Sequence, residues 1–456
     1  MAKWKLALAG TMACAVWVGG ADTAPAGDHS PPPPVAETDA HWPGEAWAGH
    51  PAACPDSCSQ TTCGTGRFDW LSADLLRCPG GCLGEPWSLF GSYQKYSVGG
   101  WAQLGYHSQA LPTFNSKPHD FQLQQAWAYA ERAIDTSRGF DIGGRIDYLY
   151  GTDGPDVQAF GSGLRGFGQG RGWDSGWERG AQYGHALPQA YLEAGYGDTS
   201  VVLGNFFSII GYEQIAAPQN FFYSRTYSRY FSNPFTHTGV LAKHDYSPDV
   251  TVYGGYTLGW DSGFNDNGDA FLGGLSLRMT DQWRLNYATS FGRFGEAGFS
   301  DFSERGYMHS MFSVFTPSDR WTYISQSDVL STEDEAGRTQ RQTYGMTQRL
   351  FYRLNDCWSF GTRFEWWNVD ASSKAFYNVD PATAIAVAND AQGDFNFYAI
   401  TFGLNYHPHA NVIIRPEIRR DWVFGDRDAF ANGQVRGLQD NARNQTTVGI
   451  DTIFLF

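Results

Sequence analysis

The sequence predicts an all-β fold, a transmembrane β-barrel of about sixteen antiparallel strands. Three observations support this prediction. Polar and apolar residues alternate in segments of about ten residues, which is the length that a tilted membrane strand needs. The connections between these segments alternate between short turns and long loops, as they do in outer-membrane barrels. The chain also ends on an amphipathic strand whose last residue, Phe456, is aromatic.

The C-terminal strand, residues 446–456, has two different faces. Val448, Ile450 and Phe454 share one face, because successive side chains of a strand point to opposite sides. The other face begins with small and polar residues, among them Asp451. We expect this strand to pair with the first strand of the sheet and close it, with the apolar face against lipid.

The composition suits short amphipathic strands. Aromatic residues make up 16% of the 456 residues, and 54 residues are glycine. The mean hydropathy is -0.39, and no apolar run beyond the leader reaches the ~18 residues that a membrane helix needs. The net charge is -15, without the basic stripe of a nucleic-acid-binding protein. A soluble all-β protein is the alternative that the composition leaves open.

The chain begins with features of an exported protein. Residues 1–21 read as a signal peptide, with Lys3 and Lys5 before a short apolar core and small residues where cleavage is expected. Residues 22–50 form a predicted Pro-rich linker, since such a composition cannot bury a core. We expect residues 51–96 to be a Cys-rich periplasmic segment, followed by the barrel at 97–456.

The Cys-rich segment has two interpretations. Exported chains meet oxidising conditions, which favours disulfides, but the spacing also permits a thiolate zinc site. The fifth cysteine is either free or paired with Cys357, which falls in a predicted periplasmic turn. The sequence does not determine the pairing. The five cysteines of the segment are Cys54, Cys58, Cys63, Cys78 and Cys82.

The alternation is clear in residues 140–150. Asp141, Arg145 and Asp147 fall on one face, and residues such as Ile146 fall on the other. A strand with lipid outside and water inside accounts for three charges on its inward face. The predicted strands are 98–107, 121–132, 140–150, 189–196, 200–210, 236–244, 250–260, 270–279, 283–291, 307–315, 321–330, 342–352, 358–369, 395–406, 412–422 and 446–456.

The segment at 412–422 carries a ladder of charges. Arg415, Glu417 and Arg419 lie on one face with alternating sign, and Pro416 predicts a local bulge because it lacks a backbone donor. Two roles stay open for such charges: they brace the wall as pairs, or they select solutes. The predicted pore-lining residues are Asp141, Arg145, Asp147, Glu193, Arg363, Glu365, Arg415, Glu417 and Arg419.

One long loop, residues 211–235, is rich in aromatic and basic residues. We expect it to fold inward and narrow the lumen, with Arg225, Tyr227 and Arg229 at the constriction. The two arginines would then face lumenal acids such as Glu193. The alternative is a solvated loop packed on its neighbours.

Four stretches give the chain a family resemblance. Residues 204–213, 220–227, 234–239 and 414–419 resemble the β-barrel porin-2 (OmpL-like) family of bacterial outer membranes, and the similarity covers about residues 97–456. The resemblance implies a porin in the bacterial outer membrane whose solute is unknown. It implies no catalytic residues, and the cysteine cluster lies outside it.

An enzyme is not expected, because no nucleophile, base and orienting group converge in the sequence pattern. His309 and Ser310, for example, fall on opposite faces of one strand. No metal or cofactor is implied. The expected partners are outer-membrane lipid, small hydrophilic solutes and the barrel-assembly machinery, which would read the C-terminal strand; a homotrimer is one candidate assembly, and nucleic acid is not a partner.

The predicted function is passive diffusion of small hydrophilic solutes through a water-filled, charge-lined lumen. The alternative is a structural or adhesive outer-membrane barrel without channel activity.

Overall fold

A computed structural model describes most of the predicted barrel. The predicted signal peptide 1–21, the linker 22–50 and nearly all of the Cys-rich segment lie outside the described residues. The described residues are 83–84, 86–90, 92–93, 95–109, 111, 113–115, 118–159, 174, 183–264, 268–296, 303–370, 394–424 and 444–456.

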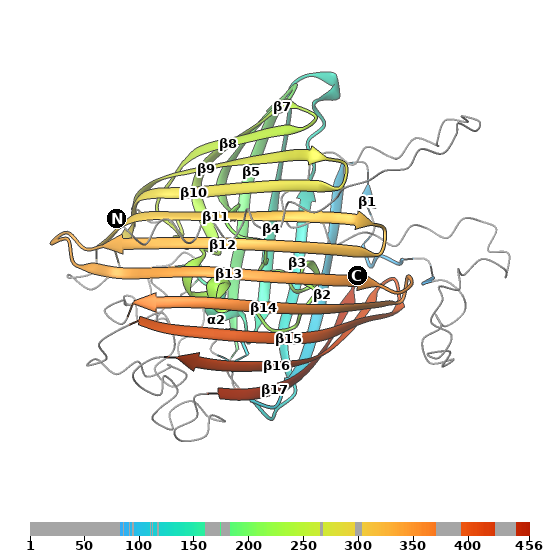
Figure 1. Cartoon of the computed structure of the whole chain (residues 1–456). Helices are drawn as coiled ribbons and strands as arrows, with labels where there is room; N and C mark the ends of the chain where they lie inside the picture. Colours follow the sequence, from blue (N-terminus) through green and yellow to red (C-terminus); the bar gives the residue numbers. More distant parts are fainter. Residues whose placement is uncertain are drawn as a thin grey trace, which may run out of the picture. The chain divides into compact units, whose positions relative to one another are not determined.

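The strands form one closed antiparallel sheet, which confirms the predicted barrel (Figure 1). The described strands number seventeen, of which β1 is a two-residue strand beside β2 and the other sixteen make the barrel wall. The sheet closes where β17 pairs with β2, with Ile450 opposite Tyr106 and Phe454 opposite Ala102. The strands are β1 (Ser92–Tyr93), β2 (Tyr96–His107), β3 (Gln122–Arg132), β4 (Asp141–Gly151), β5 (Gly184–Tyr196), β6 (Thr199–Phe207), β7 (Thr236–Ser247), β8 (Val250–Thr257), β9 (Asp269–Thr280), β10 (Trp283–Glu296), β11 (Ser303–Ser318), β12 (Trp321–Glu333), β13 (Thr339–Arg353), β14 (Trp358–Asp370), β15 (Asp394–His409), β16 (Val412–Phe424) and β17 (Asn444–Leu455).

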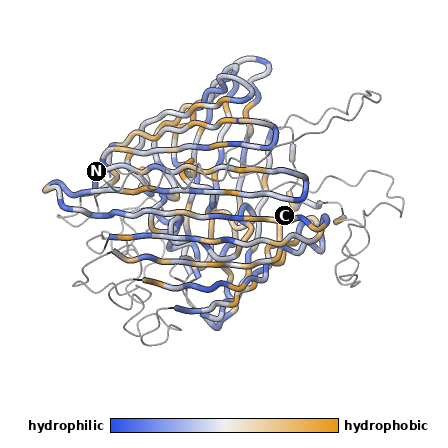
Figure 2. Tube along the Cα trace, viewed as in Figure 1, coloured by the Kyte–Doolittle hydropathy of each residue, from blue (hydrophilic) through white to orange (hydrophobic). Residues whose placement is uncertain are grey.

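Alternation along each strand gives the wall an apolar outer face. Ile146 on β4 is 51% exposed and Val448 on β17 is 52% exposed, whereas Asp147 beside Ile146 is fully buried on the inner face. Figure 2 shows this alternation as hydrophobic and hydrophilic positions that change along the strands. Exposed apolar side chains in such a band are what a lipid environment requires.

Helical structure is short among the described residues. It comprises α2 (Gly154–Val157), single 3-10 turns at Thr136–Arg138 and Ala217–Gln219, and a five-residue π-type turn at Ser228–Ser232. None of these described helices has the length and apolarity to span a membrane.

Short and long connections alternate, as predicted. Residues 197–198 join β5 to β6 and residues 281–282 join β9 to β10, whereas residues 152–183 separate β4 from β5. The connection between β6 and β7, residues 208–235, is long and fully described; we call it the inner loop.

Pro416 does not cause the predicted bulge. Its pairing with β15 lapses, but Glu417 still faces Gly403 and Ile414 still faces Tyr406, so the register is the same on both sides of the gap. The sheet therefore accommodates the missing N–H donor of Pro416 by losing strand pairing locally. It does not insert an extra residue, as a bulge would.

Three clusters of buried apolar side chains lie inside the barrel, around the inner loop. One of them joins Ile209 and Ile210 of the inner loop to wall residues such as Leu272 on β9 and Met308 on β11. A second includes Phe221 and Phe222 of the inner loop, and a third includes Ala216 and Ala217. Sequence alternation predicts a wet lumen; part of it is occupied by the inner loop and the apolar residues around it.

The chain just before the barrel packs on a periplasmic turn. The amide of Ala410 donates to the carbonyl oxygen of Leu83 at 2.9 Å, and the amide of Trp87 donates to the side chain of Asn411 at 2.9 Å. Cys357, in the neighbouring turn, is disulfide-bonded, whereas the other cysteines lie outside the described residues.

Candidate functional site

The inner loop crosses the lumen from one wall to the other. The amide of Ala217 donates to the side chain of Gln125 on β3 at 3.1 Å, and the Ser228 hydroxyl donates to Asp328 on β12. Every residue of the inner loop is buried except Pro218, Gln219 and Tyr230. The loop that the sequence marked as a constriction therefore folds inward and packs against both sides of the barrel.

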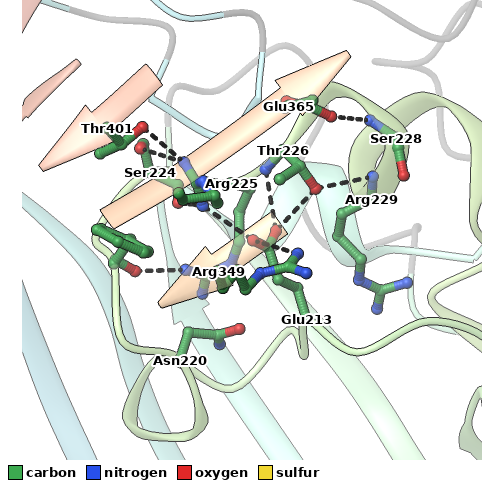
Figure 3. Close-up of polar contacts among 12 residues, drawn as sticks. Glu213, Asn220, Ser224, Arg225, Thr226, Ser228, Arg229, Arg349, Glu365 and Thr401 are labelled. Atoms are coloured by element: carbon green, nitrogen blue, oxygen red, sulfur yellow. Dashed lines mark hydrogen bonds and ion pairs between the residues drawn. The ribbon is translucent and has the colours of Figure 1, made fainter. Parts of the chain in front are cut away.

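A buried glutamate holds the centre of the inner loop to the wall (Figure 3). Oε1 of Glu213 accepts hydrogen bonds from Arg363 at 2.8 Å and from Arg349 at 3.1 Å, and Oε2 accepts from the amide of Thr226 at 2.9 Å. Burial on its own would raise the pKa of Glu213, but Arg363 and Arg349 outweigh it and hold that pKa well below its ordinary value. Glu213 is therefore a charged anchor rather than a titrating group at neutral pH.

Wall carboxylates cap amides of the inner loop. Glu417 on β16 accepts from the amide of Ser224 at 3.2 Å through both oxygens. Glu365 on β14 accepts from the amides of Tyr227 at 3.0 Å and Ser228 at 2.9 Å. These bonds supply the partners that a loop inside a barrel would otherwise take from water.

Wall arginines bind the loop's carbonyl groups in the same way. Arg415 donates to the carbonyl oxygen of Ala217 at 2.9 Å, and Arg419 donates to that of Arg225 at 2.6 Å. The charges on β14 and β16 thus fix the backbone of the inner loop. All five of the predicted pore-lining residues on these strands face the lumen, are at most 6% exposed and bind the inner loop or its neighbours: Arg363, Glu365, Arg415, Glu417 and Arg419.

Glycines in the wall make room for the loop's side chains. A Cβ at Gly105 on β2 would lie 2.6 Å from the hydroxyl oxygen of Tyr223, and one at Gly361 on β14 would lie 2.4 Å from the ring of Phe221. A larger residue at either position would force the Tyr223 or Phe221 side chain of the loop to shift. Four further wall glycines meet inner-loop side chains in this way: Gly274, Gly345, Gly403 and Gly449.

The two arginines of the predicted constriction stabilise the loop itself. Arg225 donates to the carbonyl oxygens of Phe222 at 3.2 Å and Ile215 at 3.3 Å, and Arg229 donates to that of Pro234 at 2.7 Å. Burial lowers the pKa of each to about 10.

The surroundings of these arginines differ from the expected ones. The acids that act most strongly on them are Glu213, Asp153 and Asp261, rather than the Glu193 that the sequence suggested. Tyr227 is fully buried, and its hydroxyl donates to Asp421 on β16 at 2.8 Å. Long-range contacts of this kind leave no signal in the local sequence pattern.

The predicted lumenal residues on β4 form a separate group. Asp147 accepts from Arg145 at 2.6 Å and from the Trp127 indole at 2.7 Å. Asp141 lies at the periplasmic end, where it pairs with Lys95 at 2.6 Å. The charged residues on β4 therefore face the lumen, and most of them form ion pairs with neighbouring side chains.

The wall formed by β3 and β5 keeps partly exposed residues that sequence analysis did not single out. Tyr129 and Tyr191 face the lumen, and the Arg145 guanidinium lies 4.3 Å from the centre of the Tyr129 ring. Glu193 lies two residues along β5 on the same face and is also partly exposed. Tyr191 shares a face with Glu193, so strand parity places it inward. On β3, parity groups Tyr129 with the apolar residues Phe121 and Leu123, but a register shift at Gln124 turns Tyr129 to the lumenal face. Within the described ranges, no group of three or more His, Cys, Asp or Glu residues is arranged to hold a metal ion.

Comparisons with known proteins agree with this barrel. A family model described as "Putative beta-barrel porin-2, OmpL-like" matches residues 95–456. The fold is similar to that of OmpF from Salmonella typhi in complex with daunomycin, with 11% identity over 79% of this chain and 97% of that chain, and a TM-score of 0.52. It is also similar to the trimer form of OmpT from Vibrio cholerae, with 11% identity over 80% of this chain and 100% of that chain, and a TM-score of 0.50. No curated protein matches the chain. The chain belongs to the beta-barrel porin-2, OmpL-like family, and is a porin of the bacterial outer membrane.

Proposed function

We propose that the chain is a narrow passive porin in which the inner loop sets the size of the solutes that pass. The observation that carries this proposal is the anchoring of the inner loop to strands on both sides of the lumen. A loop held by charged groups in a low-dielectric interior costs several kcal/mol to displace, so it narrows the pore permanently rather than occasionally.

The predicted pore-lining charges would then have two roles. Asp141, Arg145 and Glu193 are partly exposed next to β3 to β5, and we propose that they act on solutes directly, whereas the fully buried Asp147 holds Arg145 in place. The charged groups on β14 and β16, such as Glu365, would act indirectly by positioning the inner loop.

Planar-bilayer recording of the purified protein tests this function. A narrow porin gives discrete open steps that are small for a barrel of this size, and heat-denatured protein gives none. A protein that inserts but stays silent at all voltages would contradict the proposal. It would favour the second candidate, a structural barrel without channel activity, which the dense packing of the inner loop makes a real alternative.

We further propose that the chain has no enzymatic activity and that its terminal strand is recognised by the barrel-assembly machinery. A homotrimer is proposed because the trimer form of OmpT from Vibrio cholerae shares the fold. Chemical cross-linking in the native membrane tests the trimer, with a ladder ending at three copies expected and a monomer band alone contradicting it.

A further inference from the structure

The inner loop meets different parts of the wall in different ways. Lumenal residues on β14 and β16, such as Arg363 and Arg419, are buried and bonded to it, and Leu272 on β9 and Met308 on β11 are buried in an apolar cluster. Nearer the periplasmic end of β9, Ser276 is partly exposed and Arg278 is exposed. On β2, Trp101 and Gln103 are also buried, at 6% and 2% exposure. Toward β3 and β6, however, Tyr129 and Phe207 stay partly exposed, as does Tyr230 of the inner loop.

These three aromatic residues, which we call the aromatic track, lie against one apolar cluster. Tyr129 lies nearer the periplasmic end of β3 than Trp127, whose ring centre is 6.0 Å from that of Phe207 at the end of β6. The Tyr230 hydroxyl donates to Asp156 of α2 at 2.6 Å, beyond the outer end of β4. The track therefore rises along the wall from the periplasmic side to the outer side.

Polar groups flank the track at both ends. At the periplasmic end, Arg145 lies over the Tyr129 ring and donates to Glu131 at 3.2 Å and to Asp147 at 2.6 Å. At the outer end stands the carboxylate of Asp156. Carboxylates outnumber the single arginine, so anions are disfavoured along this wall.

We propose that the aromatic track is the solute path past the inner loop, and that it binds saccharides. A sugar ring has C–H groups on its faces, which pack on aromatic rings, and hydroxyl groups at its edge, which carboxylates and arginine bind. The described lumenal residues offer this combination of partly exposed rings and charged groups beside the inner loop. The inference rests on the proposed porin function and adds a route and a class of solute to it.

Current blockade by maltotriose in planar bilayers tests the track. Maltotriose should interrupt the wild-type current with a longer dwell time than polyethylene glycol of equal mass, which has no ring faces. Tyr129→Ala should weaken the apparent affinity for maltotriose about twofold to tenfold, the value of one aromatic contact. Tyr253→Ala is the matched control, because Tyr253 on β8 is also a partly exposed lumenal tyrosine but is not part of the track.

The outcomes separate the track from the porin function. Conduction without longer blockade by maltotriose, or equal weakening by the two alanine variants, overturns the track and leaves the porin standing. A silent wild-type protein overturns the porin function itself. If the Tyr129 variant fails to fold, Phe207→Leu serves as a second variant of the track. Its affinity for maltotriose should also fall, and an unchanged affinity would contradict the track. Heat-modifiable gel mobility shows whether each variant forms the barrel.

Discussion

Glu213→Gln removes one negative charge from the centre of the inner loop and keeps the side chain's size. In the structure this carboxylate lies 2.8 Å from Arg363 and 3.1 Å from Arg349. The two arginines are at most 2% exposed. The variant therefore leaves two buried positive charges facing a neutral amide.

The expected cost of this change is large. Removing one partner of a buried ion pair typically costs about 3–5 kcal/mol, because the other charge stays buried without compensation. The loop can avoid this cost by leaving the wall, so the cost falls on its packed state. At about 1.4 kcal/mol per factor of ten, the ratio of displaced to packed loop should rise by about two to three and a half orders of magnitude.

Hydrogen exchange measured by mass spectrometry reports the displaced loop directly. Peptides covering residues 213–235 should exchange faster in the variant, because the amides of Ser224 and Thr226 are protected by wall and loop carboxylates in the packed state. Single-channel conductance should rise in parallel, since the displaced loop no longer fills the lumen.

Glu304→Gln is the matched control for this variant. Glu304 on β11 also forms a buried ion pair, with Arg341 on β13, but that pair joins two wall strands and does not hold the inner loop. Unchanged exchange of the inner loop in the Glu213 variant would refute the reasoning. Equal acceleration in both variants would show general destabilisation of the barrel instead of a specific anchor.

Three further predictions concern neighbouring features. Burial raises the pKa of Asp153 to about 7, so the packed state of residues 152–158 favours the protonated acid. The stability of this packed state should therefore fall as pH rises from about 4 to about 7 and then level off. Hydrogen exchange corrected for intrinsic rates measures this dependence, and Asp153→Asn should remove it. Gly361→Ala places a methyl group against Phe221 and should destabilise the packing of the inner loop by about 1–3 kcal/mol, measured by thermal unfolding. Gly254→Ala, whose methyl group meets open space, should cause no such loss. Equal shifts in melting temperature for the two variants would contradict this prediction. Cys357→Ser removes the disulfide and should speed hydrogen exchange in residues 83–90, which pack beside this turn. Conductance should stay unchanged, because the disulfide lies in a turn outside the lumen. A change in conductance would instead place the disulfide in the solute path.

The barrel wall could be predicted because its signal is local. Alternation along a strand is set by neighbouring residues, so Ile146 and Asp147 reveal their opposite environments without any knowledge of the fold. The strand boundaries were also close: the predicted segment 358–369 corresponds to β14, Trp358–Asp370. Pro416 was misjudged because its effect on pairing depends on the partner strand β15.

The contents of the lumen could be predicted only in part, because they depend on contacts far apart in sequence. The inward fold of residues 211–235 follows from their aromatic and basic composition. Their anchor does not, since Glu213 and Arg363 are 150 residues apart. For the same reason the sequence could not show that Arg225 and Arg229 bind backbone carbonyl groups instead of lining an open pore.

The most direct measurement compares the single-channel conductance of the wild-type protein with that of a chain whose residues 214–232 are replaced by a short Gly-Ser linker, recorded in the same bilayer system. If the inner loop sets the size of the pore, the wild-type protein gives small steps and the shortened chain gives steps several times larger. Steps of equal size in the two proteins would contradict that claim.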